Sequence, residues 1–397
     1  MQITIPDNVT RAISILEQNG YSAYAVGGCV RDSMLGLTPF DWDICTSAMP
    51  EQTAECFDNF RVIPTGVKHG TLTVIIDTPL EITTFRIDGD YLDNRRPSEV
   101  SFTRNLQDDL CRRDFTVNAM AIDLRGEITD LYGGTDDLKA KLIRCVGDAA
   151  TRFDEDALRI MRALRFAATL GFEIESETAK AIHEKKHLLE NIAAERIQKE
   201  FTKMIVGNCR NILSEFSDVI KVFLPEIHTD SDTLRHIDAS PADSALRLAL
   251  LFGKTEAQQA AERLRKLKYD NATANTVSLL LSCADDNIST QRPQIKRLLN
   301  KYGEAGAKAV LTFCLHSEKI TNEQYTVITE IIDEIIRAGE CFTLSKLAVN
   351  GSDISSLGIF PANRIGKVLH ELLEKVMDGE TENEKNSLIN LAKKLKY

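Results

Sequence analysis

The feature that most constrains this chain is a pair of glycines between a short apolar segment and a short helical one. Residues 24–26 predict a β-strand, and residues 30–35 predict a helix. Gly27 and Gly28 between them allow backbone N–H groups to come close to a ligand, and the positive end of the following helix points the same way. This turn suits a phosphate group, with Arg31 in the first helical turn as its counter-charge.

Two alternate aspartates follow the turn. Asp41 and Asp43 lie on a second predicted strand, where residues two apart point to the same face. Adjacent carboxylates repel each other unless a cation lies between them, and Mg²⁺ is the natural occupant. Taken singly, the glycine pair is typical of an ordinary turn and the aspartates of a solvated strand face. Together, in strand–turn–helix–strand order, they indicate phosphoryl or nucleotidyl transfer through two metal ions.

Composition places limits on the partners. The formal net charge of the 397 residues is -11, which argues against generic affinity for nucleic acid, so an RNA partner would need a local basic surface. The first residues do not resemble a signal peptide, and no apolar run is long enough to cross a membrane. The nine cysteines include no Cys-x-x-Cys pair, which favours free thiols in a reducing cytoplasm.

The sequence Gly-Gly-x-Val-Arg-Asp followed by Asp-x-Asp resembles the head signature of the polymerase-β-like nucleotidyltransferases. More narrowly, it resembles the bacterial tRNA nucleotidyltransferase (CCA-adding) and poly(A) polymerase family. The resemblance implies an α+β fold, with a small mixed sheet and helices in a head and an elongated all-helical neck, body and tail. The pattern agrees, because 71–76 and 80–86 predict a β-hairpin and helical periodicity dominates after Gly147. The expected parts are a head at 1–145, a neck at 146–205, a body at 206–335 and an RNA-binding tail at 336–397.

A second motif, Arg-Arg-Asp-Phe-Thr-x-Asn-Ala, covers residues 112–119. On its residues alone, Asp114 suits the N-cap of a helix over 115–122. The resemblance implies a different role, in which Arg113 binds phosphate and Asp114 binds the ribose hydroxyls of the incoming nucleotide.

The third motif covers residues 152–166, where Asp156, Arg159, Arg162 and Arg165 recur every three residues and predict a helical ridge. The ordinary alternative is a surface ion pair between Asp156 and Arg159. A carboxylate accepts hydrogen bonds and a guanidinium donates them, which complements the pairing edges of cytosine and adenine but not those of uracil and guanine. The resemblance assigns this base recognition to Asp156 and Arg159, and further nucleotide contacts to Arg162 and Arg165.

Three further segments carry expectations. Glu81 is either a third carboxylate near the metals or a structural partner of Arg86, and the sequence favours the structural role. Residues 242–254 resemble the place where some relatives carry a His-Asp phosphohydrolase pair, but Phe252-Gly253 stands there, so we expect no such activity. The polar segment 87–97 reads as a surface connector, whereas the resemblance makes it a lever that adapts the base-recognition site to the final adenine.

The predicted function is therefore template-independent addition of CCA to tRNA 3′ ends from CTP and ATP, with release of pyrophosphate. Asp41 and Asp43 would hold Mg²⁺, and no membrane partner is expected. Enzymes that add only CC or only A, a poly(A) polymerase, and a non-catalytic RNA-binding protein are the alternatives. The sequence leaves both a monomer and a homodimer open.

Overall fold

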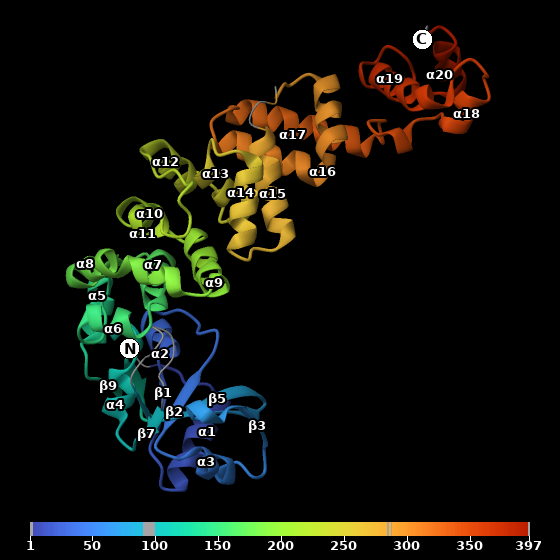
Figure 1. Cartoon of the computed structure of the whole chain (residues 1–397). Coiled ribbons are helices and arrows are strands. Elements are labelled where there is room, and N and C mark those ends of the chain that lie inside the picture. Colours follow the sequence, from blue (N-terminus) through green and yellow to red (C-terminus); the bar gives the residue numbers. More distant parts are fainter. Residues whose placement is uncertain (1–2, 90–99, 284–285, 287, 396–397) are drawn as a thin grey trace. The chain divides into compact units, whose positions relative to one another are not determined.

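The computed structural model describes residues 3–89, 100–283, 286 and 288–395. The chain divides into two compact units, one formed by residues 1–229 and 263–269 and the other by 230–262 and 270–397 (Figure 1). Most of the predicted lever, from residue 90 to 97, lies outside the described residues.

The first unit is built on a seven-stranded sheet with the strand order β3-β4-β5-β2-β1-β8-β9. Strands β2 and β5 are parallel and the other neighbours are antiparallel. The strands of this sheet are β1 (Ala23–Val26), β2 (Asp43–Thr46), β3 (Arg61–Gly66), β4 (Thr71–Ile76), β5 (Thr78–Thr84), β8 (Met120–Ile122) and β9 (Ile128–Asp130). Two small two-stranded sheets pair β6 (Arg86–Asp88) with β7 (Val100–Phe102), and β10 (Leu142–Ile143) with β11 (Glu173–Ile174).

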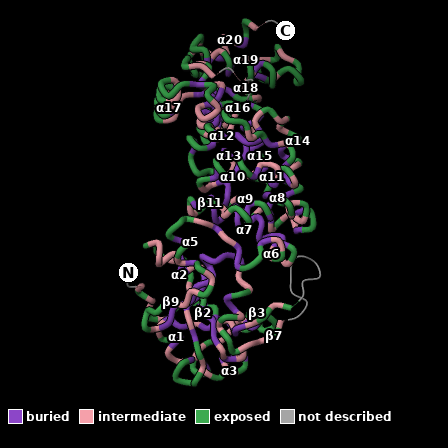
Figure 2. The backbone as a smooth tube through the Cα atoms, turned by 90° about the vertical axis from the view of Figure 1, so that its left-hand side faces the viewer, coloured by how far each residue is buried: buried purple, intermediate pink, exposed green. Residues whose placement is uncertain are grey.

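Helices complete this unit. They are α1 (Asp7–Gln18), α2 (Gly28–Met34), α3 (Pro50–Cys56), α4 (Leu106–Cys111), α5 (Gly134–Ala140), α6 (Ala149–Glu155), α7 (Leu158–Leu170), α8 (Ser176–Lys185), α9 (Ala194–Ile205), α10 (Arg210–Glu215) and α11 (Ser217–Ile220). The amphipathic pattern of α9 shows why such helices form, since Ile197 and Phe201 are buried while Lys199 and Lys203 are exposed. Figure 2 shows the buried residues concentrated along the central strands and the inner helix faces.

The second unit is helical. Its helices are α12 (Ser231–Ala239), α13 (Ser244–Phe252), α14 (Ala257–Lys266, whose last residues group with the first unit), α15 (Asn271–Ser282), α16 (Arg292–His316), α17 (Asn322–Arg337), α18 (Gly351–Ser355), α19 (Ile365–Met377) and α20 (Lys385–Ala392). Helix α16 kinks at Gly303, whose φ of 68° lies outside the right-handed helical region. None of the described helices has both the length and the apolar character needed to cross a membrane.

The predicted fold class is confirmed, because a mixed sheet with helices comes first and helices dominate the rest. One local prediction is wrong. Residues 115–122 are not an α-helix but a short 3₁₀ turn, Thr116–Asn118, followed by strand β8. All three residues of β8 are buried between β1 and β9, and this tertiary pairing overrides the local helical pattern. The four-part domain division stays a prediction.

Candidate active site

Asp43 is the first residue of β2, and Asp41 lies two residues before it. Across the parallel pair β2–β5, Asp43 is the register partner of Glu81. Asp43 and Glu81 line a hollow of about 200 Å³ together with Arg86, Arg112 and Arg113. The structure therefore places Glu81 opposite Asp43, while Arg86, its partner in the structural alternative, lines the same hollow.

The electrostatics of this hollow favour a cation. Burial, together with the negative charges of Asp41 and Glu81, raises the pKa of Asp43 to about 6, and Arg113 opposes the rise only in part. A divalent cation would remove this repulsion. Within the described residues, no group of three or more His, Cys, Asp or Glu side chains is arranged as a complete metal site. The residues present therefore fit a divalent cation that is held by two carboxylates and completes its coordination with ligands from outside the protein.

The glycine turn brings a guanidinium close to the backbone. Gly27 has a φ of 86°, a conformation that residues with a side chain rarely adopt. A Cβ atom there would lie 2.9 Å from Nη1 of Arg113, the far end of a flexible side chain, so the backbone conformation rather than the space requires glycine. The Nε atom of Arg113 is buried and has no hydrogen-bond partner among the described residues, which leaves a donor for a ligand. This geometry supports the predicted phosphate contact of Arg113.

The predicted phosphate counter-charge, Arg31, is itself buried. It pairs with Asp32, with 2.7 Å between Nη2 and Oδ1, and its Nη1 donates a hydrogen bond of 2.6 Å to Oδ1 of Asn118. Gly28 lies next to it, because a Cβ atom there would be 3.6 Å from Nη2 of Arg31. Arg31 thus lies at the turn as predicted, while its described contacts are to protein groups.

Asp114 is held from both oxygens. Its Oδ1 accepts hydrogen bonds from the Phe115 amide and from Nδ2 of Asn118, and its Oδ2 accepts from Nε and Nη2 of Arg162 at 2.8 and 2.5 Å. Burial by itself raises the pKa of Asp114, but Arg162 and the bond from Asn118 outweigh it and lower the pKa to about 2. Asp114 is therefore a fixed, ionised hydrogen-bond acceptor. Arg165 pairs with Glu200 of α9 rather than with this carboxylate.

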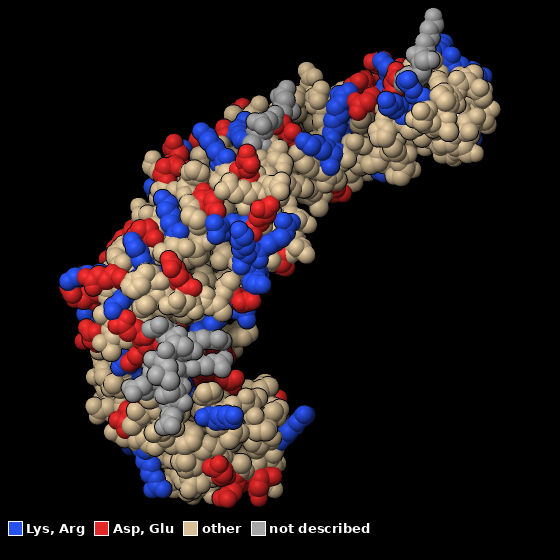
Figure 3. Space-filling model, in the orientation of Figure 1, with Lys and Arg blue, Asp and Glu red and all other residues tan. Residues whose placement is uncertain are grey.

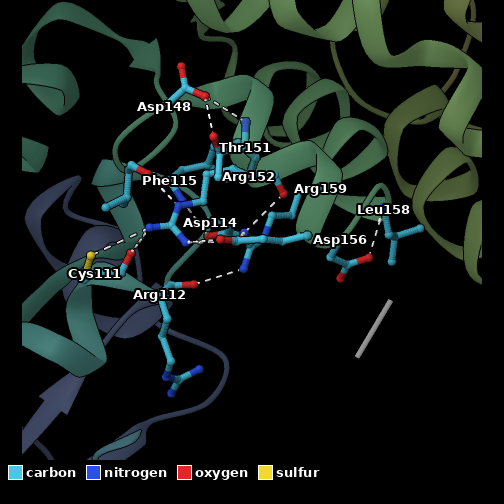
Figure 4. A network of polar contacts seen from close by, with 12 residues as sticks. Cys111, Arg112, Asp114, Phe115, Asp148, Thr151, Arg152, Asp156, Leu158 and Arg159 are labelled. Atoms are coloured by element: carbon cyan, nitrogen blue, oxygen red, sulfur yellow. Dashed lines mark hydrogen bonds and ion pairs between the residues drawn. The ribbon is translucent and has the colours of Figure 1, made fainter. Parts of the chain in front are cut away.

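The predicted ridge is interrupted. Asp156 lies in extended backbone between α6 and α7, so it is not on one continuous helix with Arg159, Arg162 and Arg165. Its Oδ1 accepts a hydrogen bond from the Leu158 amide (Figure 4). Its Oδ2 lies 3.3 Å from Nη2 of Arg196 on α9. Asp156 thus serves the first turn of α7, whose amides have no partner within the helix.

Arg159 is buried and held by other groups. Its Nη1 lies 2.5 Å from Oε2 of Glu155. Its guanidinium also donates hydrogen bonds to the carbonyl oxygens of Arg152 and Arg112 (Figure 4). An exposed ion pair between Asp156 and Arg159, the ordinary alternative, does not describe this buried guanidinium. Asp156 and Arg159 still belong to the same turn, since the Arg159 amide donates to the Asp156 carbonyl at 2.9 Å.

The motif residues match families of known proteins. A family model described as the Poly A polymerase head domain matches residues 23–144. Models for an RNA- and SrmB-binding site of polymerase A and for tRNA nucleotidyltransferase domain 2 match residues 171–230 and 241–392.

Relatives that match nearly the whole chain point to the same family. A CCA-adding enzyme of Limosilactobacillus fermentum is 36% identical over 395 residues, which cover 96% of this chain and 95% of that one. A CCA-adding enzyme of Enterococcus faecalis is also 36% identical, over 98% of this chain and 97% of its own. The chain belongs to the family of CCA-adding enzymes.

Solved structures of CCA-adding enzymes share the fold. The Bacillus stearothermophilus CCA-adding enzyme in complex with CTP is 31% identical, with a TM-score of 0.80 and coverage of 98% of both chains. The Thermotoga maritima CCA-adding enzyme complexed with tRNA has a TM-score of 0.69 at 20% identity, which shows the fold alone. The predicted family and the predicted class of enzyme, a nucleotidyltransferase, are confirmed. The individual site residues stay predictions.

The sequence analysis missed several residues that hold the arginines of the site in place. Buried Asp109 pairs with both Arg112 and Arg113, and Glu155 pairs with both Arg152 and Arg159. The spacing of Asp109 from the two arginines, three and four residues on a helical segment, was a usable signal. Residues 194–201 resemble a neck motif of the family, but nothing in the sequence indicated that Arg196 pairs with Asp156, because 40 residues separate them.

Glu81→Gln tests the electrostatics of the carboxylates. Because Glu81 raises the pKa of Asp43, its removal is expected to lower that pKa from about 6 toward the ordinary range of Asp. The metal-free protein, with ¹³C-labelled aspartate, is titrated by NMR between pH 4 and 8, and the carboxyl signal that disappears in Asp43→Asn identifies the residue. Glu51→Gln, an exposed position on α3, is the control. An unchanged Asp43 titration in Glu81→Gln would show that the two carboxylates do not interact.

Proposed function

We propose that this chain adds CCA to the 3′ ends of tRNA from CTP and ATP without a nucleic-acid template, and releases pyrophosphate. The observation that carries the proposal is the hollow in which Asp43 lies beside Glu81 and Arg113, directly behind the glycine turn. Relatives that match nearly the whole chain are CCA-adding enzymes, and solved relatives include complexes with CTP, ATP and tRNA. We place the activity in the cytoplasm, where tRNA is processed.

In this proposal each part of the site has one task. Asp41 and Asp43 would hold Mg²⁺, which when bound supplies positive charge to the reacting hydroxyl and phosphate groups. Arg113, which lines the hollow, would neutralise the triphosphate. Asp114 would accept hydrogen bonds from the ribose, and Asp156 and Arg159 would bind the pairing edge of the base. This last step requires Asp156 and Arg159 to exchange their described protein contacts for contacts with the base.

A local basic surface supports an RNA partner despite the net charge of -11. Figure 3 shows Lys and Arg side chains gathered over α9 and the end of α14. The exposed cations of these segments are Lys199, Lys203, Arg265, Lys266 and Lys268. The two segments are joined by a hydrogen bond of 3.0 Å between the hydroxyls of Thr202 and Tyr269. Such a surface suits contacts to an RNA backbone.

The decisive experiment uses three tRNA substrates, one lacking its 3′-terminal CCA, one ending in C and one ending in CC. Each is incubated with the purified protein, Mg²⁺, and CTP, ATP or both, and the products are resolved to single nucleotides. Stepwise extension to CCA on all three would support the proposal. Arrest at CC, use of the CC-ended substrate alone, or long adenosine tails would identify the CC-adding, A-adding and poly(A) alternatives, and no extension would identify a non-catalytic binder.

Deletion of residues 88–96 is expected to abolish addition of the terminal A while CTP addition stays near normal. The reason is that one recognition pair must fit a pyrimidine twice and then a larger purine, and the resemblance assigns the adjustment to this segment. The same three substrates measure the two steps separately. Equal loss of both additions would mean that the segment only supports the fold of the head.

A further inference from the structure

Phe166, on α7, is a buried aromatic residue to which the proposed chemistry gives no task. Three guanidinium groups surround its ring. Their central carbons lie 3.8 Å from the ring centroid for Arg165, 5.0 Å for Arg31 and 5.4 Å for Arg162. Arg31 comes from α2 behind the glycine turn, while the other two come from α7. The ring therefore lies between the predicted phosphate turn and the predicted recognition helix.

A continuous set of contacts connects the ring with Arg31, Asn118, Asp114 and Arg162. Arg31 donates to Oδ1 of Asn118 at 2.6 Å, and Nδ2 of Asn118 donates to Oδ1 of Asp114 at 3.1 Å. Oδ2 of Asp114 accepts from Arg162, and Arg162 and Arg31 both lie over Phe166. Each oxygen of Asp114 is thus tied to an arginine that the ring contacts.

The surrounding charges explain why an aromatic residue suits position 166. Three like charges around one point repel each other, although each has a carboxylate partner, namely Asp32, Asp114 and Glu200. The negative face of an aromatic ring attracts each cation, which an aliphatic side chain of similar size does not. Phe166 also packs edge-to-face on Phe115, with 5.8 Å between the centroids, so its plane is fixed by the segment that carries Asp114.

We propose that Phe166 is a positioning residue, whose ring holds Arg31 and Arg162 in register so that Asp114 is presented to the incoming nucleotide. The inference rests on the proposed function in one respect, that the ligand of Asp114 is CTP or ATP. Phe166 itself touches the arginines and Phe115, and acts on the nucleotide only through them.

Fluorinated phenylalanines test the ring electrostatics without changing its size. Mono-, di- and trifluorophenylalanine are introduced at position 166, and binding of CTP in the absence of RNA is measured by equilibrium dialysis. Because each fluorine weakens the negative ring face, the dissociation constant is expected to rise step by step, by about three- to tenfold over the series. Phe166→Leu should lose as much affinity as the trifluoro protein, and Phe166→Tyr should retain most of it.

Phe153 provides the matched control. It is fully buried on α6, and among the described residues no Lys or Arg lies over its ring. The same series at position 153 is expected to leave CTP binding unchanged, and thermal unfolding checks that each protein is folded. Unchanged affinity across the Phe166 series, or an equal loss in both series, would overturn the positioning role alone. Wild-type protein that binds neither CTP nor ATP would overturn the proposed function together with it.

Discussion

Asp43→Ala and Asp41→Ala are each expected to lower nucleotide addition by on the order of a thousandfold or more, because each removes a carboxylate from the proposed metal site. The fold should survive, because the ionised carboxylate of Asp43 destabilises the metal-free protein.

The pKa of Asp43 also predicts an effect on stability. Burial and two neighbouring charges raise this pKa to about 6. A native pKa above the unfolded value means that the metal-free protein loses stability as the pH rises from the ordinary Asp range through about 6. Asp43→Asn should therefore raise the unfolding temperature of the metal-free protein at neutral pH.

The measurements are single-turnover extension of tRNA and thermal unfolding without metal. Asp58→Ala, an exposed aspartate between α3 and β3, should behave as wild type in both. Normal turnover with Mg²⁺ in either Asp41→Ala or Asp43→Ala would remove these carboxylates from the chemistry.

Asp156→Ala is expected to reduce discrimination between CTP and UTP by about a hundredfold, because a site that hydrogen-bonds its substrate rejects a mismatched edge by leaving its own groups unpaired. Addition from CTP and ATP should slow at the same time. The ratio of kcat/KM for CTP and UTP measures the effect. Asp154→Ala is the matched control, since Asp154 lies in the same motif but pairs with Lys185 at the surface.

Arg159→Ala should also reduce discrimination between CTP and UTP, but this variant is expected to change stability as well. Its guanidinium also binds Glu155 and the carbonyl oxygen of Arg112, so its loss is expected to lower the unfolding temperature as well. If Asp156→Ala kept the wild-type nucleotide preference, the only roles of Asp156 would be to accept a hydrogen bond from the Leu158 amide and to contact Arg196.

Much of the fold and part of the site could be predicted from local patterns in the sequence. The turn at Gly27 and Gly28 could be predicted because a glycine pair between an apolar strand and a helix has few conformations open to it. The hairpin of β4 and β5 followed from two β-branched runs around a turn. Both depend on residues that are neighbours in the sequence.

What could not be predicted depends on partners far along the chain. Strand β8 looks helical by itself and is a strand because β1 and β9 pair with it. Three-residue spacing suggested that Asp156 continues a ridge, yet the backbone leaves the helix there and Arg196, 40 residues away, meets its carboxylate. Arginine spacing likewise gave no sign that Arg162 pairs with Asp114, which lies 48 residues earlier.

Asp43 and Asp114 respond differently to acid. With a pKa of about 2, Asp114 keeps its charge in any medium that a cell tolerates, whereas Asp43, with a pKa of about 6, takes up a proton under mild acidification. In the metal-free protein these two carboxylates therefore lose their charges at different acidities. Uptake of a cation at this hollow is therefore expected to weaken under mild acidification, because protons compete for Asp43, while the ion pair of Asp114 with Arg162 stays intact.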